Sequence, residues 1–80
     1  MVKDKIPKEL IEKWLNKLKK KMENVKPADK KGEELLKNIQ AYIIDTEHFL
    51  DQGDYIRAWE AISFDWGLFE AGEDLKVLKD

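Results

Sequence analysis

The sequence predicts an all-α protein, an up-down-up antiparallel three-helix bundle. Apolar residues recur at spacings of three and four along most of the 80 residues, as they do on one face of a helix. The pair Gly53-Asp54 has the residue types that end one helix and cap the start of the next. Helices joined so closely are expected to lie antiparallel and to pack along their lengths.

The first helix is expected over residues 7–25. Pro7 suits the first turn because its missing N–H is not needed there, and Pro27 ends the helix. One apolar stripe is expected to face the core, with Trp14 as a core residue and lysines on the opposite side. The stripe consists of Leu10, Ile11, Trp14, Leu15, Leu18, Met22 and Val25.

The second helix is expected over residues 31–52, after a short linker in which Asp29 is a plausible N-cap. Gly32 weakens the start of this helix. Ile44 and His48 lie together on the side away from the apolar face. That face consists of Leu35, Leu36, Ile39, Tyr42, Ile43, Thr46, Phe49 and Leu50.

The third helix is expected over residues 55–71, with Gly72 as its C-terminal stop. Gly67 inside a helix costs about 1 kcal/mol relative to Ala, so another chain segment is expected to approach closely there. Glu60 and Asp65 are expected on the solvated flanks. The apolar seam consists of Tyr55, Trp59, Ile62, Trp66 and Phe69.

Phe64 and Leu68 fall outside this seam and indicate a second apolar face on the third helix. Either the tail of residues 73–80 folds over them or another subunit does. The tail offers three apolar residues for this purpose: Leu75, Val77 and Leu78.

Length and composition predict a single helical domain, residues 1–80, in the cytoplasm. The chain has no Cys, no apolar run of membrane-spanning length and no apolar signal core near Met1, so no membrane partner is expected. Charge is uneven. Residues 1–31 hold eleven Lys against five acidic residues, and residues 32–80 hold three Lys and one Arg against twelve. Attraction between the first helix and the other two explains this split more simply than nucleic-acid binding does.

Motifs for catalysis are missing from the sequence. There is no phosphate-binding Gly loop, no Gly-x-Ser-x-Gly and no His-Glu-x-x-His. Ser63 is the only serine, and it lies far in sequence from the only histidine, His48. One hypothesis is a metal or catalytic site formed by His48 with Glu47 and Asp51. The sequence has no second histidine to support such a site. We therefore expect no enzyme activity, no metal and no cofactor.

One stretch of the chain resembles a known family. It runs Ala41-Tyr42, then Asp45 to Leu50 with His48-Phe49, then Gly53 to Ala61, and closes with Trp66 to Gly72. This run resembles an archaeal family of small proteins classed as domain of unknown function 357, over roughly residues 35–72. The resemblance implies a three-helix bundle without assigned activity and supplies no catalytic residues. Asp65 stands where a small residue is expected.

Two function classes follow. The first is a protein interaction or assembly module, a homodimer or a subunit of a larger complex, because exposed apolar clusters usually mark partners. Its candidate interface is Ile44, His48, Phe64 and Leu68. The alternative is nucleic-acid binding through the Lys-rich first helix. The candidate patch is Lys13, Lys17, Lys19, Lys20 and Lys21.

Overall fold

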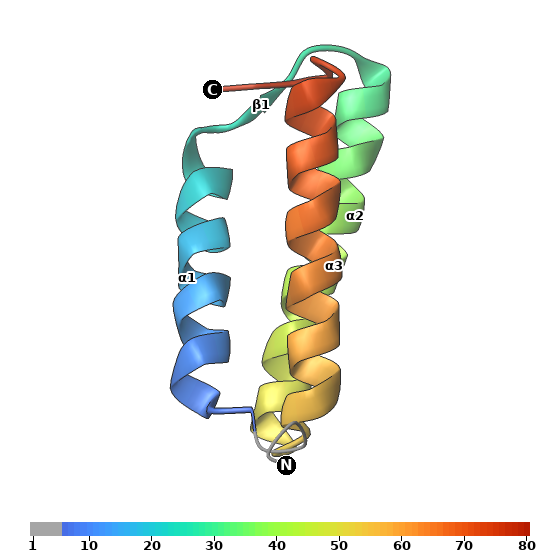
Figure 1. Cartoon of the computed structure of the whole chain (residues 1–80). Coiled ribbons are helices and arrows are strands. Elements are labelled where there is room, and N and C mark those ends of the chain that lie inside the picture. The colour runs from blue at the N-terminus through green and yellow to red at the C-terminus, as the bar shows by residue number, and fades with distance from the viewer. Residues whose placement is uncertain (1–5) are drawn as a thin grey trace.

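The computed structural model describes residues 6–80 and has three helices in up-down-up order (Figure 1). The predicted all-α three-helix bundle is confirmed. Helices α1 and α3 run in the same direction, and α2, which follows α1 and precedes α3 along the chain, runs in the opposite one. The elements are α1 (Lys8–Asn24), β1 (Lys26–Pro27), α2 (Lys30–Asp51), α3 (Tyr55–Asp74) and β2 (Leu78–Lys79).

The helix junctions follow the predicted capping chemistry. Asp29 caps α2, where its Oδ1 accepts a 2.9 Å hydrogen bond from the Gly32 N–H. Gly53 ends the α2 segment with φ +73°, a left-handed conformation that glycine adopts without a Cβ penalty. Asp54 then caps α3 by accepting from the Arg57 N–H at 3.2 Å. These contacts join α2 and α3 into a tight helical hairpin.

The core lies between the three helices and is made of one apolar stripe from each. The tryptophans are only half-buried and pack against the edge of this core, so the prediction of Trp14 as a core residue was only partly right. The buried hydrophobic residues are Ile11, Leu15, Leu18, Val25, Ile39, Ile43, Ala58, Ala61, Ile62, Phe69 and Leu78.

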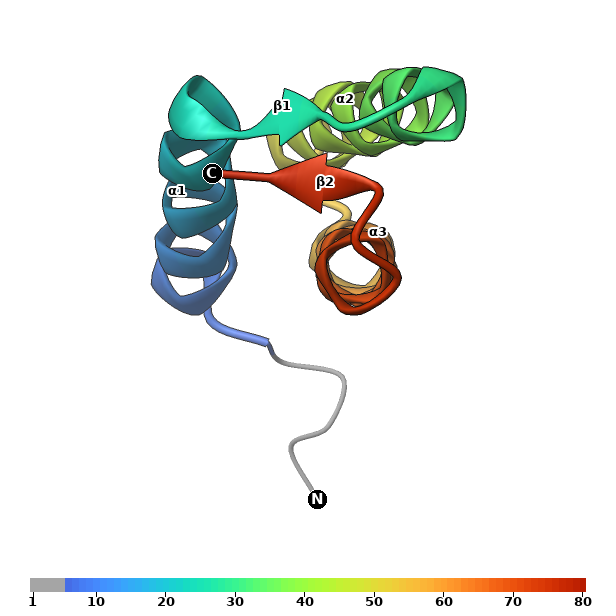
Figure 2. The same cartoon turned by 90° about the horizontal axis from the view of Figure 1, so that it is seen from above.

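The tail returns across the open end of the bundle. Strand β2 pairs antiparallel with β1, with Lys26 opposite Lys79 and Pro27 opposite Leu78 (Figure 2). The Ala28 N–H donates to the Val77 carbonyl at 2.8 Å. Two-residue strands of this kind carry no periodicity that a sequence could reveal, and they were not predicted. The pairing ties the α1–α2 linker to the C-terminal segment.

Two expectations about glycines were wrong, and a third glycine has a role that was not expected. Helix α3 does not stop at Gly72 but continues to Asp74, and Gly72 is buried beneath Leu78 and Leu35. No chain segment approaches Gly67, which is exposed with nothing within 4 Å of an added Cβ. Gly32 is not merely a weak helix start, since a Cβ there would collide with the Val77 carbonyl oxygen. The close approaches are therefore at residues 32 and 72.

The tail does not cover Phe64. Leu78 is buried at the end of the bundle, and Leu75 is exposed. Phe64 remains 55% exposed, while Leu68 is half-buried against the core. Of the two alternatives for covering Phe64, the tail of residues 73–80 is excluded, because the pairing of β2 with β1 holds it beside the linker between α1 and α2.

Candidate functional site

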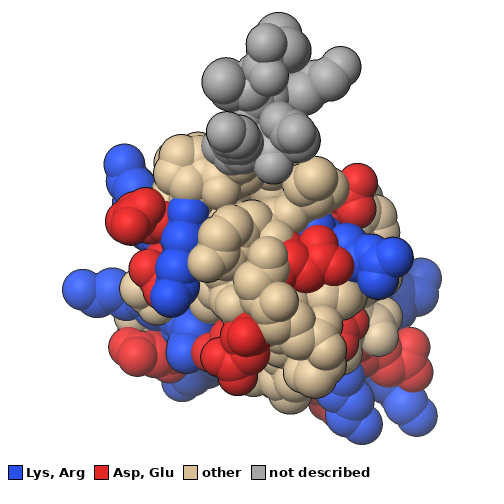
Figure 3. Space-filling view, turned by 90° about the horizontal axis from the view of Figure 1, so that it is seen from below, with Lys and Arg blue, Asp and Glu red and all other residues tan. Residues whose placement is uncertain are grey.

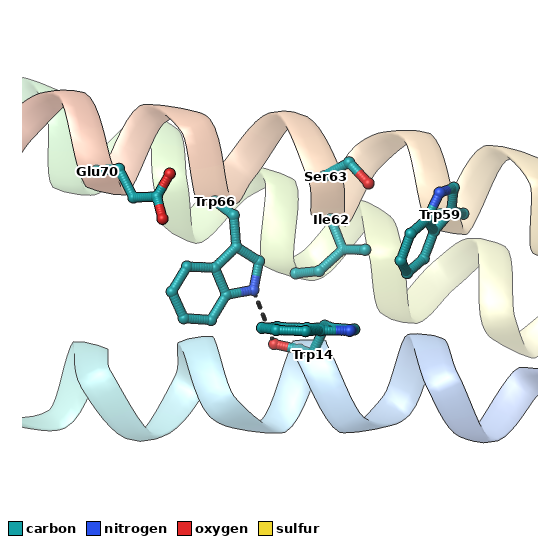
Figure 4. A pocket seen from close by; sticks show the side chains of 6 residues that line it. All are labelled: Trp14, Trp59, Ile62, Ser63, Trp66 and Glu70. Atoms are coloured by element: carbon teal, nitrogen blue, oxygen red, sulfur yellow. Dashed lines mark hydrogen bonds between the residues drawn. The ribbon is translucent and has the colours of Figure 1, made fainter.

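A groove lined by three tryptophans runs between α1 and α3 (Figure 4). Its volume is about 300 Å³. We call it the indole groove and define it by its lining residues, which are Trp14 from α1 and Trp59, Ile62, Ser63, Trp66 and Glu70 from α3. The α3 residues are spaced by three and four, so one face of that helix supplies them all.

Two of the three indoles, those of Trp14 and Trp66, are held in place by their contacts with each other. The Trp66 Nε1–H donates to the Trp14 carbonyl oxygen at 3.0 Å, shown as a dashed line in Figure 4. The rings of Trp14 and Trp66 meet edge to face at 88° with centroids 5.8 Å apart. Trp66 also meets Phe69 edge to face, at 6.0 Å. A groove with a fixed Trp66 needs little reordering when it binds a partner.

The two sides of the indole groove differ in charge. On the α1 side, the Lys17 Nζ lies 4.8 Å from the centroid of the Trp14 ring, and the Lys13 Nζ lies 6.0 Å from it. On the α3 side, Glu70 lines the groove. Figure 3 views the end of the bundle where α1 begins and shows uncharged surface interrupted by acidic side chains, with most of the blue basic side chains around its edge.

Comparison with known proteins places this chain in a family. A family described as protein of unknown function (DUF357) matches residues 9–78. The chain belongs to the DUF357 family. The crystal structure of protein AF1782 from Archaeoglobus fulgidus, of the same family, is similar to this chain, with a TM-score of 0.82 and 29% sequence identity over 91% of each chain. No curated protein matches this chain. The resemblance to the family is therefore confirmed.

The interface residues predicted for this DUF357 protein do not form one surface. Tyr42 lies two positions before Ile44, so Ile44 sits about 160° around α2 from it. Phe64 packs against Tyr42 with ring centroids 5.1 Å apart. His48 lies one turn beyond Ile44, where its Nε2 is 3.2 Å from the Gln52 Nε2. Ile44 and His48 are therefore separated from Phe64 by the width of α2.

Phe64 instead borders a second shallow groove between α2 and α3, with a volume of about 340 Å³. Its lining is Tyr42, Phe49, Arg57, Glu60, Ala61 and Phe64. Of the four candidate interface residues, Phe64 alone lines this groove.

The five lysines of the predicted nucleic-acid patch are dispersed around α1. Lys13 and Lys17 lie beside Trp14. Lys19 turns toward α2, and its Nζ forms a 2.8 Å ion pair with Glu47. Lys20 and Lys21 line a hollow with Asn24 and Asp80 at the end of the helix. Acidic side chains thus lie beside Lys19, Lys20 and Lys21.

Asp65 is fully buried, with 0% exposure, and neither carboxyl oxygen has a hydrogen-bond partner. The expectation that it is solvated was wrong. Burial raises the pKa of Asp65 from its usual 3.8 to about 7, because removal from water disfavours the charged form. Its spacing of four from both Ala61 and Phe69 was the available signal, since these residues share the buried side of α3.

Among residues 6–80, no group of three or more His, Asp or Glu side chains is arranged to hold a metal ion. Over the same range, no helix has both the length and the apolar character needed to cross a membrane. The chemistry that the indole groove offers is therefore apolar contact, one hydroxyl at Ser63 and one carboxylate at Glu70.

Proposed function

We propose that this protein is a non-catalytic protein interaction module of the cytoplasm, and that it binds its partner in the indole groove. One observation carries the proposal: three half-buried tryptophans converge on a single open groove. Tryptophan is enriched among the residues that dominate binding energy at protein interfaces, since its large surface packs well and its N–H remains available for hydrogen bonding.

The dimensions of the groove suit side chains of another polypeptide. About 300 Å³ is at the lower end of the range for small-molecule sites, and the groove is open along the helices. An amphipathic helix places anchors on one face at spacings of three and four, which is the pattern that such a groove accepts. Its polar residues, Ser63 and Glu70, both lie on α3 with Trp59 and Trp66, and they include no base next to the hydroxyl.

Nucleic-acid binding through Lys13, Lys17, Lys19, Lys20 and Lys21 remains the alternative, with less support. Stacking of bases requires free aromatic faces. The Lys17 ammonium lies over the Trp14 ring, and the Trp66 edge contacts the same ring. Glu70 in the groove would repel a phosphate backbone. The candidate interface around Phe64 is retained as a second contact surface, because Phe64 and Tyr42 are accessible beside one another.

Site-specific photo-crosslinking in cells of the source organism tests the proposal. A benzophenone amino acid at Ser63, on the wall of the groove, is expected to form a discrete polypeptide adduct on irradiation. The same group at Lys37, an exposed position on α2, is the matched control and is expected to form none. When Trp59→Ala is introduced as a second substitution in the protein with benzophenone at position 63, the yield of adduct is expected to fall, because one wall of the groove is removed. Equal labelling at both positions, or none at Ser63, contradicts the proposal.

A further inference from the structure

We propose that the occupant of the indole groove is a second copy of this chain, related by a two-fold axis parallel to the helices. This inference rests on the proposed function, because it takes the groove as the binding face. In this arrangement α1 of each copy packs against α3 of the other, and the two indole grooves face each other. Closed two-fold dimers are the commonest form of homo-oligomer.

The first argument is that the two rims of the groove carry opposite charges. Lys13 and Lys17 form the α1 rim, and Glu70 lies on the α3 rim with Asp74 one turn further along. All four side chains are exposed. The ion pairs among residues 6–80 are Lys8–Glu12, Lys19–Glu47 and Arg57–Asp54, so none of them uses a rim charge. The rim charges are thus available to a partner with the complementary pattern.

The second argument is register. Trp14 and Trp66 lie within about one helical turn of each other along the bundle, since the Trp66 indole reaches the Trp14 carbonyl oxygen at 3.0 Å. Helices α1 and α3 run in parallel, and each residue rises about 1.5 Å. Lys17 is three residues beyond Trp14, and Glu70 is four residues beyond Trp66. The two charged positions therefore lie within about one helical turn (about 5.4 Å) of each other in height, and a two-fold axis along the helices brings Lys17 within side-chain reach of Glu70 of the second copy.

The rim charges also favour a two-fold axis parallel to the helices over one that lies across them. A two-fold axis lying across the helices would place α1 against α1 and α3 against α3. The lysine-bearing α1 rims would then face each other, and so would the α3 rims that carry Glu70 and Asp74. Like charges placed together across an interface oppose association, whereas opposite ones favour it. The axis parallel to the helices is therefore the one that the surface charge supports.

The third argument is the apolar surface around the groove. Leu10 on α1 is 37% exposed and Ile56 on α3 is 45% exposed, and both are large aliphatic residues toward the end where α1 begins. Gly67 presents no side chain on the outer side of α3, so a neighbouring helix can approach there. A typical stable interface buries about 800 Å² per partner. This is about 14% of the 5727 Å² surface, which one face of the bundle can supply.

Sedimentation equilibrium of the full chain tests the dimer. The wild type is expected to approach twice 9.4 kDa as its concentration rises. Lys17→Glu and Glu70→Lys, each alone, are expected to weaken self-association by about tenfold, because each places two like-charged pairs in the symmetric interface. The double variant Lys17→Glu/Glu70→Lys is expected to regain most of the lost affinity. Lys37→Glu is the control on α2 and is expected to leave the dimer unchanged.

Two results overturn the second copy as occupant. One is a wild type that stays at 9.4 kDa at the highest concentration. The other is a double variant that associates no better than the single variants. A benzophenone adduct at Ser63 with a different polypeptide, together with a monomeric wild type, keeps the groove as a binding site and rejects the dimer. Loss of the Ser63 adduct rejects the proposed function itself.

Discussion

The two flanks of α3 pack against their neighbours in different ways. The flank toward α2 has small residues, Ala58, Ala61 and Gly72, and all three are buried. The flank toward α1 has Trp59 and Trp66, which are half-buried and leave a groove of about 300 Å³. Small side chains let two helix backbones approach, whereas indoles hold them apart. The first flank therefore supports stability, and the second one offers a surface for binding.

Asp65 interrupts the well-packed flank. A buried carboxyl group without a hydrogen-bond partner opposes folding when it is ionised. Burial raises its pKa to about 7, so in the folded protein it keeps its proton over a wide range of pH. The better-packed side of α3 thus contains the Asp65 carboxyl group, whose ionisation lowers the stability of the fold.

The largest expected effect is on the pH dependence of the unfolding free energy, which the substitution Asp65→Asn should remove. Between pH 3.8 and about 7 the unfolded chain has released the Asp65 proton while the folded protein keeps it. The stability of the wild type therefore falls as pH rises through this window, by about 4 kcal/mol at most, and then levels off above pH 7. Urea unfolding from pH 4 to pH 8 should show that the variant lacks this decline.

Glu60→Gln is the matched control, because it removes an exposed carboxylate from the same helix. Its pH profile should follow that of the wild type. Parallel profiles of the wild type and Asp65→Asn across the whole range would mean that Asp65 finds water or a partner, and the contrast between the two flanks would be weaker than stated.

The next effect concerns Gly72 on the α2 flank. In Gly72→Ala the new Cβ would lie 2.5 Å from the Leu78 Cδ1 and 2.6 Å from the Leu35 Cδ2. Overpacking of this kind costs about 1–3 kcal/mol, which exceeds the gain of about 1 kcal/mol in helix propensity. The variant should lose about 1 kcal/mol in unfolding free energy, measured in urea. A more stable variant would show that the two leucines move aside freely.

The same substitution at Gly67 should have the opposite sign. Nothing lies within 4 Å of a Cβ at that position, and the residue is exposed. Gly67→Ala should therefore stabilise the monomer by about 1 kcal/mol through helix propensity alone. Urea unfolding in dilute solution checks this, with Gly72→Ala measured in parallel. If both variants lose stability, α3 is equally crowded on its two sides.

These glycines also show what the sequence could and could not predict. The helices, the Gly53-Asp54 turn and the Asp29 cap follow from local chemistry, and the structure contains all of them. Whether Gly67 or Gly72 meets another segment depends on where the tail runs. The tail is positioned by the pairing of β1 with β2, a contact between residues about fifty positions apart. Periodicity within one helix contains no information on such a contact.

The indole groove could not be predicted from the sequence, because it too depends on contacts between separate segments of the chain. Helical spacing places Trp14, Trp59 and Trp66 on inward-facing stripes, and each does pack against the core. How far two helices stand apart depends on the bulk of both facing stripes together. Wide spacing leaves ring edges accessible, so residues expected in the core line a groove instead. Asp65 shows the reverse case, a polar residue that the spacing of its neighbours buries.

The last effect, no larger than those at the two glycines, tests the α1 flank. Trp66→Phe removes the 3.0 Å hydrogen bond to the Trp14 carbonyl oxygen while it keeps an aromatic ring in the groove. The loss should be about 1 kcal/mol, the usual net value of one hydrogen bond. Trp59→Phe is the matched control on the same wall and should cost less, since the indole bond to Trp14 stays intact. Urea unfolding followed by far-UV circular dichroism measures both without relying on indole fluorescence. Equal losses would mean that ring size, and not the bond to Trp14, holds α1 at its distance from α3, and that the groove is less rigid than its contacts indicate.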